Sequence, residues 1–124
     1  MKMRSKQEIE KAIKEIITQF LEMQLGDRLE AVVTQIEDDA IVVKLKDILP
    51  PAEKMLIRHD EGTRLIKELK EKLIEKVRPS LKAAVENLIG VEITDIYSIF
   101  NETTGEVILF LTLKNAMELI NTDE

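Results

Sequence analysis

A run of five consecutive apolar residues, Val107–Leu111, is the feature that most constrains the fold of this chain. Because successive side chains of a strand point to opposite faces, a strand with this sequence is apolar on both faces. Strands of this kind lie in the centre of a sheet and are covered on both sides. The chain must therefore supply two covering layers for its sheet, or leave one of them to a partner.

A first β-hairpin is predicted over residues 28–46. Both of its strands are rich in β-branched side chains, and the Asp38-Asp39 pair between them suits a tight turn. Alternation along the second strand predicts one buried face and one mostly solvated face. The residues expected on the buried face are Ile41, Val43 and Leu45, and those on the other face are Val42, Lys44 and Lys46.

The apolar run itself belongs to a second predicted hairpin, over residues 91–114. Its connection, residues 101–105, contains Gly105, which can adopt a left-handed backbone conformation. The two hairpins together predict a four-stranded antiparallel sheet.

The N-terminal part predicts an amphipathic helix over residues 6–25. Ser5 and Glu8 have the spacing of a capping box, and Gly26 follows the last turn, where glycine ends many helices. One face of this helix is expected to be apolar, with Ile9, Ile13, Ile16, Ile17, Phe20 and Leu21 at three- and four-residue steps.

Helices are also predicted between the hairpins, over residues 51–89. Pro51 can occupy the first position of a short helix that continues over residues 52–58. Apolar residues keep helical spacing over residues 63–89, on both sides of Pro79. Because the spacing stays in phase across this proline, we expect a kink there rather than a break.

A short final helix is predicted over residues 116–121, where Asn115 and Glu118 repeat the capping-box spacing. The whole chain, residues 1–124, then reads as a single α+β domain. The long, Pro-kinked helix is expected to cover one face of the sheet. The N-terminal helix, or a partner subunit, must cover the other, and on this ground we predict a homodimer.

Composition excludes several classes of function. The chain has 124 residues, a formal net charge of -6 and only 3% aromatic residues, which argues against binding to nucleic acid or to anionic membranes. It has no cysteine and a single histidine, so thiolate chemistry and most zinc sites are excluded. The polar start and the short apolar runs predict a protein without a signal peptide or a membrane-spanning segment, and therefore a cytoplasmic one.

The segment around the only histidine is the tentative anion or interaction site. His59 lies beside Arg58 and two carboxylates, so it could serve as a base, but the favoured interpretation is a surface histidine near a helix start. Gly62, Thr63 and Arg64 could bind an anion at the start of the long helix. The adjacent Asp60-Glu61 pair would itself occupy that positive end, which favours a self-capped helix.

No catalytic, cofactor-binding or metal-binding residue is predicted. The carboxylates of residues 37–39 lie in a turn that is too short for a calcium loop, so we expect them to be solvated.

Several short motifs, taken together, resemble the MpsC-like family, which is named for a sodium-translocating membrane-potential-generating system. These motifs are Ile41–Leu49, Leu49–Lys54, Gly62–Leu65, Gly90-Val91 and Thr104–Glu106 before an apolar strand. The resemblance covers residues 9–113. One departure is Pro50, where the family has a threonine that could cap the following helix. The resemblance implies a link to ion transport and carries no established catalytic residues with it.

The sequence therefore predicts a non-enzymatic interaction or accessory module, which is dimeric and has a protein partner; the resemblance implies a partner associated with a membrane. The alternative is a small-molecule sensor with an aliphatic pocket between the sheet and the helices. A third hypothesis, an enzyme that uses carboxylates alone, requires two acidic side chains converging in a cleft.

Overall fold

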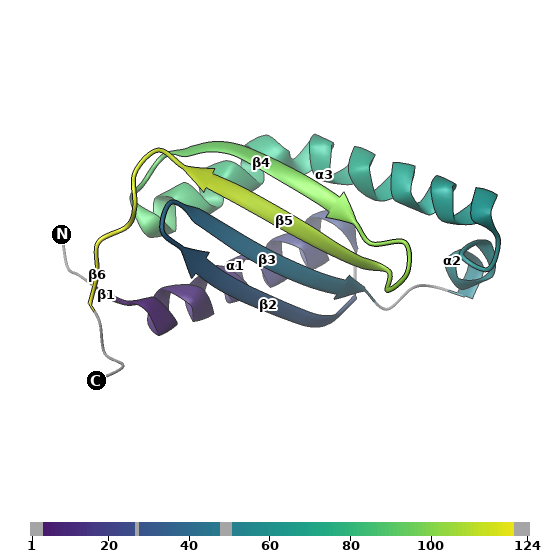
Figure 1. Cartoon of the computed structure of the whole chain (residues 1–124), viewed down its shortest axis with the longest axis horizontal. Helices are drawn as coiled ribbons and strands as arrows, with labels where there is room; N and C mark the ends of the chain where they lie inside the picture. Colours follow the sequence, from purple (N-terminus) through teal and green to yellow (C-terminus); the bar gives the residue numbers. More distant parts are fainter. Residues whose placement is uncertain (1–3, 27, 48–50, 121–124) are drawn as a thin grey trace.

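The two predicted hairpins form one antiparallel sheet of four strands in the order β2-β3-β5-β4 (Figure 1). The computed structural model describes residues 4–26, 28–47 and 51–120. The strands of this sheet are β2 (Leu29–Glu37), β3 (Ala40–Asp47), β4 (Ile93–Phe100) and β5 (Glu106–Leu113). The apolar run therefore lies in a central strand, β5, as predicted, and the fold is α+β.

The sheet buries one of its faces completely. On β5 every second residue is buried, beginning at Val107, and the residues between them are half-buried. On β3 the residues predicted for the inner face, Ile41, Val43 and Leu45, are at most 3% exposed. The strand periodicity thus identified the core face of the sheet correctly.

Both long helices lie on this same face of the sheet, behind the strands in Figure 1. Helix α1 (Lys6–Leu25) packs against β2 and α3, while α3 (Asp60–Ile89) packs against β4. Both helices that were predicted to cover the sheet therefore do so, but of the two covers considered for the second face, the N-terminal helix or a partner subunit, the N-terminal helix does not lie there. Four strands about 4.8 Å apart are wide enough for two helices that pack 8–10 Å from each other. The second face is left open.

Local capping explains where α1 begins and ends. The Ser5 hydroxyl accepts a hydrogen bond from the Glu8 amide at 3.1 Å and donates one to the Glu8 carboxylate at 3.0 Å. At the other end, Gly26 has φ 69 and its amide donates to the Glu22 carbonyl. Both signals were predicted. The apolar stripe packs into the core, where Ile9, Ile13, Ile17 and Leu21 are buried.

Helix α3 is longer than the sheet that it covers. Its 30 residues correspond to about 45 Å at 1.5 Å per residue, whereas strands of 8 residues span about 26 Å. The helix continues through Pro79 without a break, as predicted. Its first half projects beyond the sheet, where α2 (Pro51–Leu56) packs against it (Figure 1). Pro50, the departure from the family pattern, lies outside the described residues.

The predicted helix at residues 116–121 is wrong over its described part. Residues 116–118 have no regular secondary structure, and Leu119–Ile120 (β6) pairs in parallel with Arg4–Ser5 (β1), just before α1. A helix this short is marginal unless packing supports it, as packing against α3 supports the six residues of α2. Pairing with β1 gives the backbone of this segment hydrogen-bond partners instead. Residue 121 lies outside the described residues.

Candidate interaction surface

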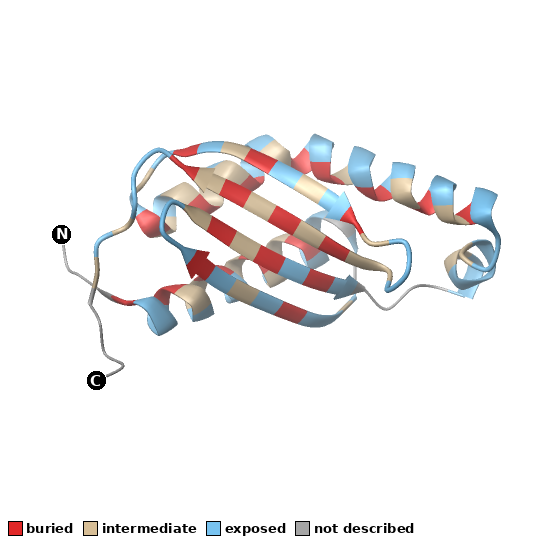
Figure 2. Ribbon diagram, viewed as in Figure 1, coloured by how far each residue is buried: buried red, intermediate tan, exposed pale blue. Residues whose placement is uncertain are grey.

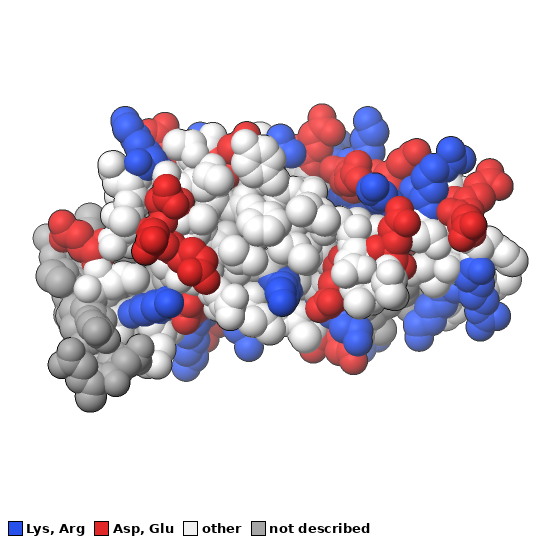
Figure 3. Space-filling view, in the orientation of Figure 1, with Lys and Arg blue, Asp and Glu red and all other residues white. Residues whose placement is uncertain are grey.

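The uncovered face of the sheet carries a group of apolar side chains that we call the apolar patch. Figure 2 shows half-buried and exposed residues alternating with buried ones along the strands. In Figure 3, uncharged side chains fill the middle of this face, and charged ones surround them. The apolar patch consists of Val33, Val42, Tyr97, Ile99, Ile108 and Phe110.

Strand register places these side chains in adjacent rows. In one row, Ile108 of β5 has Lys44 of β3 and Ile99 of β4 as its neighbours. In the next row, Phe110 lies between Val42 and Tyr97. Cross-strand neighbours on one face are close enough for their side chains to touch, so the rows form one continuous surface.

The apolar patch is far more exposed than the opposite face. Tyr97 is 54%, Ile99 52% and Val33 51% exposed, whereas Ile96, the residue before Tyr97, is 1% exposed. Ile108 and Phe110 are half-buried because their neighbours on both sides shield them. A contiguous apolar surface of this kind on a sheet is typical of a site that binds a partner.

Charges around the apolar patch are unequal at its two ends. Lys44 stands inside the patch, and Lys46 lies further along β3, where it pairs with Glu30 at 3.6 Å. At the opposite end, the carboxylates of residues 37–39 lie at the turn between β2 and β3, and Asp95 lies on β4. The β2–β3 hairpin therefore has lysines near its open end and carboxylates at its turn.

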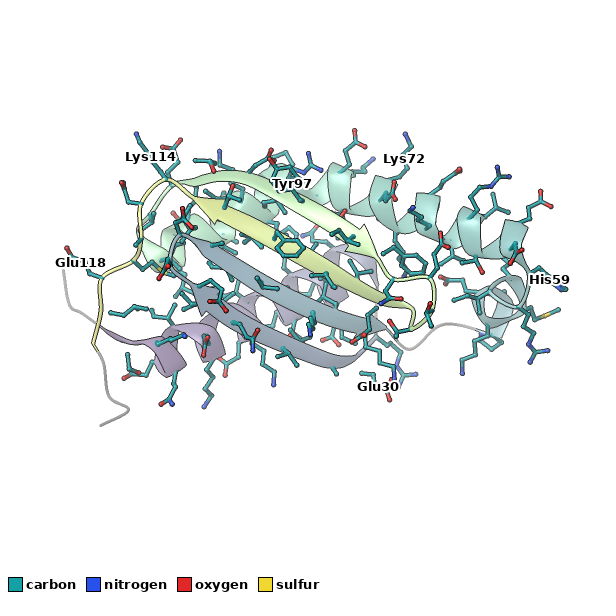
Figure 4. All side chains as sticks on the ribbon, in the orientation of Figure 1. Glu30, His59, Lys72, Tyr97, Lys114 and Glu118 are labelled. Carbon is teal, nitrogen blue, oxygen red and sulfur yellow. The ribbon has the colours of Figure 1, made fainter. Side chains whose placement is uncertain are left out.

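Tyr97 and Asp95 point to the same side of β4 and interact. A hydrogen bond to the Asp95 carboxylate and its negative charge raise the pKa of the Tyr97 hydroxyl above its ordinary value of 10.0, and partial burial adds to the effect. The same carboxylate accepts a hydrogen bond from the Ile96 amide at 2.7 Å. Tyr97 is therefore a neutral hydrogen-bond donor about midway along the edge strand β4 (Figure 4).

The tentative anion site lies at the other end of the molecule, where α2 meets α3. His59 precedes α3, is exposed, and makes no capping hydrogen bond through its side chain. Figure 4 shows it far from Tyr97. Arg58 and Arg64 are exposed too. The Thr63 amide donates to the His59 carbonyl at 2.9 Å, so this amide already has a partner inside the protein.

Gly62 in this segment has a packing role. A Cβ atom at this position would overlap the Leu56 carbonyl oxygen and lie 2.8 Å from the Leu56 Cα. The Thr63 hydroxyl donates to the Ile57 carbonyl at 3.1 Å. The motif that suggested an anion site thus holds α2 against α3, and anion binding there stays a prediction.

The acidic turn is tied to the sheet through its backbone. The Asp39 carbonyl accepts a hydrogen bond from the Leu113 amide at 2.8 Å. Within the described part of the chain, no group of three or more histidine, aspartate or glutamate side chains is arranged to hold a metal ion.

Buried aliphatic side chains fill the layer between the sheet and the helices. The sensor hypothesis predicts its ligand pocket in this layer. Its core includes Ile13, Ile17, Leu81, Val85 and Leu109, each with no measurable exposure. The Thr34 hydroxyl is buried and has no hydrogen-bond partner among the described residues. The sensor hypothesis stays a prediction.

Sequence analysis did not single out Tyr97 and Asp95. The sequence of β4 contained a signal for them. Tyr97 and Ile99 each lie next to a buried residue, Ile96 and Phe100, so their side chains point to the opposite face of the sheet. Combined with the apolar outer residues of β5, this alternation would have located the apolar patch.

These features define a class of protein: a small α+β protein with a sheet that is covered by helices on one face and carries an apolar surface on the other. The chain belongs to the MpsC family, described as "Na+-translocating membrane potential-generating system (MpsC)", whose model matches residues 5–115. The resemblance seen in the sequence is thereby confirmed.

One relative of this chain is "Uncharacterized protein YbcI" of Bacillus subtilis (strain 168). It is 33% identical over 115 residues, which cover 93% of each protein. No solved structure matches the chain. No helix among residues 4–26, 28–47 and 51–120 has both the length and the apolar character needed to cross a bilayer.

Proposed function

We propose that this chain is a non-enzymatic docking module, an accessory to a membrane ion-translocating system, and that the open face of its sheet is the docking surface. The observation that carries the proposal is the half-exposed apolar patch, which extends across all four strands of the sheet, with both long helices on the opposite side. An apolar surface that the protein's own helices leave uncovered gains free energy when a partner removes it from water.

Two further features support this function over catalysis. The exposed tyrosine hydroxyl of the patch has a raised pKa, so a smaller fraction of it is present as the phenolate that would act as a nucleophile or base. The family description names a system that translocates Na+, and no described helix can cross a membrane. A role beside the membrane-spanning part of such a system fits both observations.

Site-specific photo-crosslinking in living cells tests the proposal. A photoreactive amino acid at position 99, in the apolar patch, is expected to form a covalent protein adduct. The control is position 72, because Lys72 is an exposed residue on α3, away from the patch (Figure 4). An adduct from position 99 alone supports a docking surface. The absence of an adduct, or equal adducts from both positions, would refute it.

The same experiment tests the link to a membrane system. Adducts that sediment with the membrane fraction, and dissolve only in detergent, are expected if the module works beside a membrane protein. Adducts that stay in the supernatant would support docking while contradicting the membrane link.

A further inference from the structure

We infer that the open face is covered by a second copy of this chain, packed sheet to sheet with its strands running in the opposite direction. This inference rests on the proposed docking function and names the occupant of that surface. It follows from how apolar and charged groups are distributed on the face.

The centre of the face is suited to a self-complementary contact. Two neighbouring rows of side chains lie there. One row consists of Val42, Phe110 and Tyr97, and the next contains Ile108 and Ile99. In a twofold symmetric dimer, the same surface serves both partners, so rows near the axis pack against their own copies. Aliphatic and aromatic side chains can interdigitate in such a contact, as they do between the sheets of a β-sandwich.

Charge selects the orientation of the second copy. Lys44 lies on one side of the row formed by Val42 and Phe110, and Glu37 lies at the other end of the same hairpin, paired with Ala40. If the twofold axis lies in the interface and runs perpendicular to the strands, Lys44 of each copy comes toward Glu37 of the other. If the axis instead runs parallel to the strands, the lysines of one copy lie beside the lysines of the other, and the carboxylates beside the carboxylates. Opposed charges favour the first arrangement and like charges disfavour the second.

The same charges argue against a lipid surface as the occupant. Residues 37–39 and Asp95 place carboxylates along one end of the patch, and the chain as a whole has a net charge of -6. Anionic headgroups would repel this end of the face. A second copy brings its own lysine to the carboxylates, so each face supplies the charge that the other lacks.

The single tyrosine provides a probe at the interface. The chain has one tyrosine and no tryptophan, so its intrinsic fluorescence comes from Tyr97. We expect sedimentation equilibrium to show a monomer–dimer transition across a roughly thousandfold dilution series. Quenching of the Tyr97 fluorescence by iodide should decrease over the same range as the dimer forms. A transition in mass without a change in quenching would place the interface elsewhere and refute the inference.

Matched apolar substitutions test the patch. Ile99→Gln is expected to raise the dissociation constant by at least roughly tenfold, since it replaces an apolar contact with a polar one. Leu69→Gln is the control, because Leu69 is 43% exposed on α3 and Ile99 is 52% exposed. Far-ultraviolet circular dichroism verifies that both variants fold. Equal effects of the two substitutions would contradict an interface at the sheet.

Charge reversal tests the orientation. Lys44→Glu or Glu37→Lys alone should weaken the dimer, because each places like charges together across the interface. The double variant carries both reversals and should recover most of the lost affinity. If the double variant dimerises as weakly as the single variants, the arrangement with oppositely directed strands is refuted.

A monomer at every concentration would refute the second copy as occupant. Crosslinking from position 99 to a protein other than this chain would then still support the docking function. Loss of both the dimer and the crosslink would refute the inference and the proposed function together.

Discussion

At the scale of single residues, the interaction between Tyr97 and Asp95 is the best-defined polar feature of the open face. Asp95 is held in place by the Ile96 amide and raises the pKa of the Tyr97 hydroxyl through its hydrogen bond and its charge. The neutral hydroxyl is therefore favoured in the folded protein. This contribution to stability is present below pH 10 and is lost as the pH rises through the raised pKa.

Removing the charge of Asp95 should bring the pKa of Tyr97 back toward 10.0, the ordinary value for a tyrosine. Asp95→Asn keeps the size of the side chain, replaces the charged acceptor of the Tyr97 hydrogen bond with a weaker neutral one, and removes the negative charge that opposes formation of tyrosinate. The ultraviolet absorbance of tyrosinate measures this titration, and it reports on Tyr97 alone. Glu30→Gln, a carboxylate on the other edge strand, is the control and should leave the titration unchanged. A wild-type protein that titrates below pH 10 would contradict this account.

Residues with local roles were predictable from the sequence, whereas those with roles across strands were not. The Ser5 cap and the Gly26 helix end each depend on a few neighbouring positions, and both were predicted. Tyr97 owes its place beside Phe110 to the pairing of β4 with β5, a relation that no local pattern specifies. Gly62 was predicted as part of an anion site, but the contact that requires glycine is with Leu56 of another helix.

At the scale of elements, the contact between α2 and α3 depends on a close approach of their backbones. Gly62 is buried against the Leu56 backbone, and Lys70 of α3 pairs with Glu53 of α2 at 3.9 Å. Both side chains of this ion pair are largely buried, which makes it one of the better shielded pairs in the described part of the chain. Contacts with α2 thus help to stabilise the projecting half of α3.

Gly62→Ala should destabilise the protein, although alanine is the better helix former. The added methyl group overlaps the Leu56 carbonyl, and overpacking of this kind costs about 1–3 kcal/mol, which exceeds the helix-propensity gain of about 1 kcal/mol. Urea unfolding followed by circular dichroism measures the effect. Ser80→Ala, at an exposed position of the same helix, is the control and should be neutral or slightly stabilising. A stabilised Gly62→Ala variant would show that the two helices separate without cost.

Pro79→Ala is expected to stabilise α3. Alanine restores the amide that can donate to the Glu75 carbonyl and removes the ring that crowds it, a difference of up to about 3 kcal/mol in a helix interior. Pro79 is exposed, so the substitution leaves no cavity. The same urea titration measures the gain. Destabilisation instead would mean that the proline shapes the helix so that Val77 and Leu81 both reach the core.

At the scale of the whole molecule, the covering of the sheet was predicted in part. The sequence indicated that β5 is central and apolar on both faces, and the structure confirms both properties. The side on which each helix packs was not predictable, because amphipathic periodicity shows that α1 has an apolar face without showing which surface receives it. Since α1 and α3 share one face, neither of these helices shields the outer side chains of β5 from water.

If a second copy of the chain covers the open face, the thermal stability should depend on protein concentration. If unfolding separates a dimer into two unfolded chains, each tenfold increase in concentration adds about 1.4 kcal/mol to the stability of the dimer. With an unfolding entropy of about 2.1 cal/mol/K per residue, Tm should rise by about 3 °C for each tenfold step. Calorimetry over a dilution series measures this slope. Ile99→Gln should reduce the slope toward zero, because a monomer unfolds at a Tm that is independent of its concentration, whereas Leu69→Gln should keep it. A wild-type Tm that does not change with concentration would show that each chain unfolds alone, with its apolar patch in water.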